Sequence, residues 1–163
     1  MAPVDPTPQH GFMGTSADEP HPPATVKMTA DRATGAQTYQ LPISRLQLRL
    51  IDPETDVWAI EQAESHARLR YIATRTTGLL DSGYIIRGRH ADAAIALGRI
   101  PEEHCALDVR FTTARLRWRL ETTTPARRVG YHLWVTEAAG AFDLAVLEAD
   151  GEPIASTQLS LIA

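Results

Sequence analysis

Four side chains able to transfer protons lie between residues 56 and 66, namely Asp56, Glu61, Glu64 and His66. Carboxylates and imidazoles are the usual general acids and bases of enzymes, and histidine titrates near neutral pH. On a helix, Glu61 and Glu64 would be near neighbours, three residues apart. A solvated helix face explains the same charges, because Glu64 and Arg68 have the spacing of an exposed ion pair. Acid–base catalysis is thus one of two interpretations that stay open.

Four aromatic side chains are candidates for substrate binding: Trp58, Tyr71, Trp118 and Trp134. The first two accompany the acids, and the other two lie in predicted strands of the second half. Large aromatic side chains either pack in the core or form the wall of an apolar ligand cavity. The sequence alone leaves both interpretations open.

Several other kinds of site are disfavoured. Cys105 is the only cysteine, which excludes an intrachain disulfide and a multi-cysteine zinc site. The histidines at 66, 90 and 104 lack metal-ligand spacing, and no glycine-rich phosphate motif is present, so we expect no metal and no cofactor. Lys27 is the only lysine beside a large set of arginines, which indicates either a GC-rich genome or groups suited to carboxylate or phosphate.

The whole chain has the composition of one globular domain, with 163 residues, 44% of them hydrophobic. Its net charge of −4 argues against nucleic acid as a partner. No apolar run approaches the ~20 residues of a membrane span, and the first residues do not resemble a signal peptide. We therefore expect a cytoplasmic protein without a membrane partner. Residues 1–24 hold six of the eleven prolines and predict a disordered tail before a single domain at 25–163.

The candidate acids require an element to position them, and the pattern predicts a long helix over residues 53–76. Strict alternation over residues 45–50 predicts a preceding strand with Leu46, Leu48 and Leu50 on its buried face. Asp52 suits a helix N-cap, and Gly78 suits a C-terminal stop. No glycine or proline interrupts the segment between Pro53 and Gly78.

The second half predicts a series of antiparallel strands. Alternating apolar residues indicate strands near 84–86, 109–120, 129–135, 142–146 and 154–162, the second with a bulge or bend near residues 113–114. Residues 90–97 fit either a helical turn or a strand. Turns are predicted at 122–125 and 138–140, and a hairpin at Asp150-Gly151. The fold class is α+β, an antiparallel sheet with a helix on one face.

This order of elements resembles the hotdog-fold superfamily, which includes acyl-CoA thioesterases, acyl-thioester dehydratases and A-factor biosynthesis proteins. Residues 109–111, 125–135 and 140–155 resemble the closing strands of its dehydratase-like members. Residues 46–50, Asp52 and residues 67–72 resemble the entry strand and helix of its thioesterase-like members. The resemblance covers about residues 41–163.

The resemblance implies a hotdog-like domain in which a curved antiparallel β-sheet wraps the long helix. It implies an acyl-thioester-processing enzyme, most often a thioesterase on acyl-CoA or acyl-carrier protein in fatty-acid or polyketide metabolism. Asp56, Glu61, Glu64 or His66 would supply the catalytic group, and sheet edges would pair into a homodimer. The thioesterase pattern Asp…Gly-His-Val-Asn and the dehydratase histidine before Pro-Gly are absent. A dehydratase, a cyclase and a non-catalytic small-molecule-binding domain are therefore alternatives.

Overall fold

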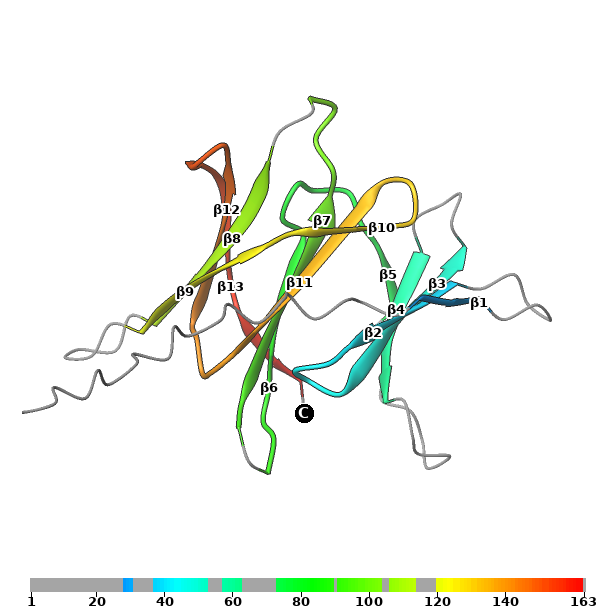
Figure 1. Cartoon of the computed structure of the whole chain (residues 1–163), viewed down its shortest axis with the longest axis horizontal. Helices are drawn as coiled ribbons and strands as arrows, with labels where there is room; N and C mark the ends of the chain where they lie inside the picture. Colours follow the sequence, from blue (N-terminus) through cyan, green and yellow to red (C-terminus); the bar gives the residue numbers. More distant parts are fainter. Residues whose placement is uncertain are drawn as a thin grey trace, which may run out of the picture.

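The computed structural model describes residues 28–30, 37–52, 57–62, 73–89, 91–103, 106–113 and 120–162. These residues form strands and connecting turns without a helix, so this part of the chain is all-β (Figure 1). The predicted α+β class and hotdog-like architecture are wrong, because the described chain contains no long helix for a sheet to wrap. None of these residues belongs to a helix able to cross a bilayer. The predicted tail at 1–24 lies outside the described residues.

The strands form three sheets, which we call A, B and C. Sheet A has the order β1 (Met28–Ala30), β2 (Gln37–Leu41), β3 (Leu46–Asp52), β4 (Val57–Gln62) and β5 (Ala73–Arg75). Sheet B has the order β10 (Arg127–Val129), β11 (Leu133–Ala139), β7 (Ala93–Arg99), β6 (Ser82–Ile86) and β14 (Ser160–Ile162). Sheet C has the order β13 (Glu152–Gln158), β12 (Leu144–Ala149), β8 (Leu107–Thr112) and β9 (Glu121–Pro125).

A helix was predicted over residues 53–76, but its described parts at 57–62 and 73–75 form the strands β4 and β5. Residues 53–56 and 63–72 lie outside the described residues. The antiparallel register places Trp58 opposite Leu50 and Ile60 opposite Leu48. All four side chains are buried on one face, so the segment follows the two-residue period of a strand. Aromatic and β-branched residues such as Trp58 and Ile60 also favour strands. Pairing with β3 satisfies the backbone and buries these side chains together, which outweighs the favourable helix-cap residues.

The three sheets stack as layers, with sheet B in the middle. Figure 1 shows β8 and β12 at the left, β6, β7 and β11 in the centre, and β2 to β4 at the right. Strand β7 is buried on both faces, and only its last residue is exposed. Its larger side chains, Ile95 and Leu97, belong to the cluster shared with sheet A, and Ala94 and Ala96 to the cluster shared with sheet C.

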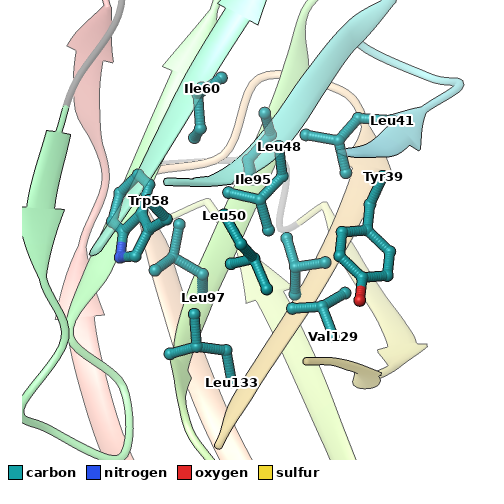
Figure 2. Close-up of a cluster of buried hydrophobic side chains, with 11 residues drawn as sticks. Tyr39, Leu41, Leu48, Leu50, Trp58, Ile60, Ile95, Leu97, Val129 and Leu133 are labelled. Carbon is teal, nitrogen blue, oxygen red and sulfur yellow. The ribbon is translucent and has the colours of Figure 1, made fainter. Parts of the chain in front are cut away.

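The core between sheets A and B is made of alternate leucine, isoleucine and aromatic side chains (Figure 2). Its buried members are Tyr39, Leu41, Leu48, Leu50, Trp58 and Ile60 from sheet A, and Ile95, Leu97, Val129, Leu133 and Val135 from sheet B. The predicted buried face of β3 is thus confirmed for Leu48 and Leu50, and Leu46 packs against the same cluster. Burial of so much apolar surface is the main force joining the two sheets.

Sheets B and C are joined into a closed ring of strands. Strands β9 and β10 are separated only by Ala126, so one extended segment pairs with β8 and then with β11. Strands β13 and β14 are separated only by Leu159, and β14 pairs in parallel with β6. The ring encloses a second core that contains Phe111, Trp134 and Phe142. Sheet A lies outside this ring, and its edge strands are β1 and β5.

The other predictions for the second half had mixed outcomes. The Asp150-Gly151 hairpin is confirmed, with φ values of 51° and 85° that suit this turn. Residues 90–97 contribute to a strand, β7. The turn predicted at 122–125 is wrong, because these residues lie in β9. The single strand predicted over 129–135 is also wrong: it divides into β10, a turn and β11.

Candidate functional site

The structure describes three of the eight predicted site residues: Trp58, Glu61 and Trp134. The other five, Asp56, Glu64, His66, Tyr71 and Trp118, lie outside the described residues. Of the four proposed catalytic groups the structure describes only Glu61, so their grouping in one site stays a prediction. In that part, no group of three or more histidine, cysteine, aspartate or glutamate residues is arranged to hold a metal ion.

Glu61 is held in an ion pair on the face of sheet A that points away from sheet B. It is only 3% exposed. Its carboxylate accepts two hydrogen bonds from Arg49, one from Nε at 2.9 Å and one from Nη2. Gln47 Nε2 donates to the second oxygen at 3.3 Å. Both oxygens have partners from β3, an arrangement that ties two strands together. Catalysis by Glu61 stays a prediction.

Trp58 lies in the core between sheets A and B, and Trp134 lies in the core enclosed by the ring. Trp58 is fully buried, and its Nε1 donates to Thr76 Oγ1 at 2.5 Å. Trp134 is 1% exposed, and its Nε1 donates to Leu79 O at 2.9 Å and Arg99 O at 3.1 Å. Trp134 also borders a small cavity of about 180 Å³ beside Ile100, Leu107 and Arg128. Their role in substrate binding stays a prediction.

A larger cavity of about 500 Å³ lies where two turns meet at one end of the space between sheets A and B. The turn between β2 and β3 and the end of β4 form one side, and the end of β6, the turn that follows it and the start of β7 form the other. Its lining residues are Ile43, Ser44, Arg45, Gln62, Ile86, Gly88, Arg89, Ala91 and Ala93. We call this space the inter-sheet cavity. Its size is typical of sites for small organic molecules.

The turn between β2 and β3 is fixed by a carboxylate from the middle sheet. Glu137 of β11 accepts hydrogen bonds from Ile43 N at 2.7 Å and Ser44 N at 3.0 Å. Arg45 has a φ of 59°, an uncommon value for a residue with a side chain, and it closes the turn into β3. These contacts hold the turn against sheet B and give one wall of the inter-sheet cavity a defined shape.

The lining combines an apolar floor with a polar rim. Ala93 is 3% exposed and is the most deeply buried lining residue, and Ile86 of the neighbouring strand is partly buried. Arg45, Gln62 and Arg89 are exposed and lie at the rim. Among the described residues, the lining contains no aspartate or glutamate. The site can hold an apolar group inside and hydrogen-bond a polar group at its opening.

The sequence alone singled out neither Arg45 nor Arg89, although the predominance of arginine was noted. Residues 45 and 89 are far apart in the chain, and no spacing rule connects them. Only the packing of sheet A on sheet B places both at one opening.

The fold and this cavity define a class of protein: a layered all-β domain with an open cavity between two of its sheets. Compared with protein-family models, with curated proteins and with solved structures, the chain gives no match. The assignment of function therefore depends on the geometry of the site.

Proposed function

We propose that this chain is a small-molecule-binding domain whose ligand occupies the inter-sheet cavity. The cavity itself supports the proposal most directly, because its volume of about 500 Å³ lies within the usual range for ligand sites. Convergent polar groups at the rim would orient a ligand, and apolar side chains within would exclude water from it. Ser44 and Gln62 can donate or accept hydrogen bonds there.

The lining favours binding over catalysis. A catalytic site needs a base or a nucleophile within hydrogen-bond reach of the reacting atom, usually supported by a second group. The cavity has one hydroxyl, Ser44, whose Oγ donates to Leu41 O at 3.4 Å. Among the lining residues that the structure describes, none is a histidine or a carboxylate that could activate it.

The test is a fluorescence titration of the full chain with two probes of nearly the same shape. N-phenyl-1-naphthylamine is neutral, and 1-anilinonaphthalene-8-sulfonate carries one negative charge. We expect saturable binding of at least one probe with one site per chain. Ala91→Trp fills the opening from an exposed rim position and should weaken binding at least about tenfold, about 1.4 kcal/mol.

Ala106→Trp is the matched control, because Ala106 is also exposed but lies beside Asp150 at the third sheet. It should leave probe binding unchanged. Absence of saturable binding, or equal binding in both tryptophan variants, would contradict the proposal. Near-UV circular dichroism excludes a molten state, which binds such probes through loosened packing.

Acyl-thioester hydrolysis remains a separate proposal that rests on the sequence resemblance alone. The helix that was to carry its catalytic acids is replaced by β4 at residues 57–62. Hydrolysis of acyl-CoA and acyl-carrier-protein substrates tests it directly. If activity is present, Asp56→Asn, Glu61→Gln, Glu64→Gln and His66→Ala should identify the group responsible. Activity that is unchanged in all four variants would reject these residues.

A further inference from the structure

We infer that the ligand of the inter-sheet cavity carries an anionic head group, which Arg45 and Arg89 hold at the rim. This inference rests on the proposed binding function and names the chemical class of the ligand. The two guanidinium groups come from different turns, one after β2 and one after β6, and each borders the same cavity. Arginine stays charged at all physiological pH values and matches carboxylate, sulfonate and phosphate geometry through its fork of N–H donors.

The two rim arginines differ from Arg49 and Arg110 in their partners. Arg49 is paired with Glu61, and Arg110 Nε donates to Glu148 at 2.6 Å. By contrast, neither Arg45 nor Arg89 forms an ion pair with another residue that the structure describes. Their donors are therefore available to a ligand.

The carboxylate that fixes the turn before Arg45 is occupied by backbone amides. Glu137 does not line the cavity, and its two oxygens accept hydrogen bonds from the amides of Ile43 and Ser44. The described part of the lining thus carries two positive charges and no negative one. A low-dielectric wall beside such a pair strengthens its attraction for an anion.

The apolar part of the lining specifies the rest of the ligand. Ile43 is 45% exposed, a large apolar side chain at the rim, and Ile86 and Ala93 continue the apolar surface inward. A free inorganic anion would leave this surface wetted. An organic anion with an apolar body would cover it and gain the hydrophobic contribution of burial. The expected class is therefore a small amphipathic anion.

The charged and neutral naphthyl probes test this inference on the full chain. We expect the sulfonate to bind at least about tenfold more tightly than the neutral amine, about 1.4 kcal/mol. Arg45→Gln and Arg89→Gln should each weaken sulfonate binding by about three- to tenfold and change binding of the neutral probe much less. Raising the salt concentration should weaken only the sulfonate, because exposed charges are screened.

Arg87→Gln is the matched control, since Arg87 is exposed in the same turn but does not line the cavity. Displacement of the sulfonate by octanoate, octyl phosphate and octanol then identifies the head group: the anions should displace it at lower concentration than the alcohol. Equal affinity for both naphthyl probes, with no effect of either arginine, would overturn the anion inference while leaving the binding site intact. Failure of both probes to bind would instead reject the proposed function.

Discussion

Glu61 and Tyr39 show how single polar groups join strands that apolar packing alone would leave less well defined. Glu61 lies on the face of β4 opposite the core, where it meets Arg49 and Gln47 of β3. Tyr39 reaches from sheet A to the turn of the β10–β11 hairpin, where its hydroxyl accepts a hydrogen bond from Gly130 N at 2.9 Å. The same hydroxyl donates to Gln37 Oε1 at 2.9 Å. Figure 2 shows this hydroxyl at the edge of the core, beside Val129.

Replacing Glu61 by glutamine should destabilise the fold. The change leaves the Arg49 charge without its counter-ion, while water still reaches Arg49, whose side chain is 37% exposed. We expect a loss of about 1–2 kcal/mol in the free energy of unfolding, measured by urea denaturation. Glu152→Gln, an exposed position at the start of β13, is the control. Equal stability of the two variants would show that the ion pair contributes nothing.

Tyr39→Phe should remove the hydrogen bond that joins sheet A to the hairpin of sheet B while keeping the aromatic ring in the core. The loss should be about 1 kcal/mol, the usual net value for one buried hydrogen bond. Amide hydrogen exchange at Gly130 should become faster in this variant. Tyr131→Phe provides the comparison, because Tyr131 is 67% exposed and should have no effect. Unchanged exchange at Gly130 would contradict the proposed link.

Strand β7 is the element on which the layered arrangement depends, because it contributes to both cores. The loop at residues 78–80 packs directly against it, through Arg99 N donating to Gly78 O at 2.9 Å and Asp81 N donating to Leu97 O at 3.1 Å. Gly98 permits this approach: a Cβ atom there would lie 1.9 Å from Leu79 O and 2.9 Å from Trp134 Cζ2. Because Gly98 has no side chain, both the backbone at Leu79 and the indole of Trp134 can pack against it.

Gly98→Ala should be strongly destabilising, because the added methyl group meets a backbone oxygen that cannot move without breaking neighbouring hydrogen bonds. We expect a loss of about 3 kcal/mol, measured as a fall in the denaturation midpoint, together with a changed tryptophan emission. Gly78→Ala is the control, because its nearest neighbour would be 3.6 Å away. A Gly98→Ala protein as stable as Gly78→Ala would refute this packing.

The whole molecule combines a closed ring with an open sheet, and its last strand completes the ring. Strand β14 pairs in parallel with β6 through Tyr84, Ile85 and Ile86. Leu159, which precedes it, packs against the ring core. The predicted homo-oligomer remains a proposal, and light scattering after size-exclusion chromatography tests it. The edge strands of sheet A, β1 and β5, are candidates for such pairing, and a strict monomer would reject the proposal.

Deleting residues 159–163 should open the ring between β6 and β13. The loss of Leu159 and of the β14 pairing should lower the free energy of unfolding by at least about 2 kcal/mol, since burying one leucine contributes a comparable amount. Amide exchange along β6 should become faster. Deletion of Ala163 alone is the control, because it leaves β14 intact. A truncated protein with unchanged stability and exchange would show that closure is not needed.

The sequence by itself determined elements that depend only on residues close together in the chain, such as one alternating strand and one tight turn. The alternation in β3 predicts its buried face, and Asp150-Gly151 predicts its hairpin because few residues adopt the required positive φ values. The arginine-rich composition left open either a GC-rich genome or groups suited to anions, and it pointed to no location.

The identity of β4 and the location of the candidate site were decided by tertiary structure. Trp58 and Ile60 fit a helix or a strand equally when considered alone, and pairing with Leu50 and Leu48 selects the strand. Arg45 and Arg89 meet at one cavity only because sheet A packs on sheet B. Burial and cross-strand pairing join residues that are distant in the chain, so their free energies leave no signature in local spacing.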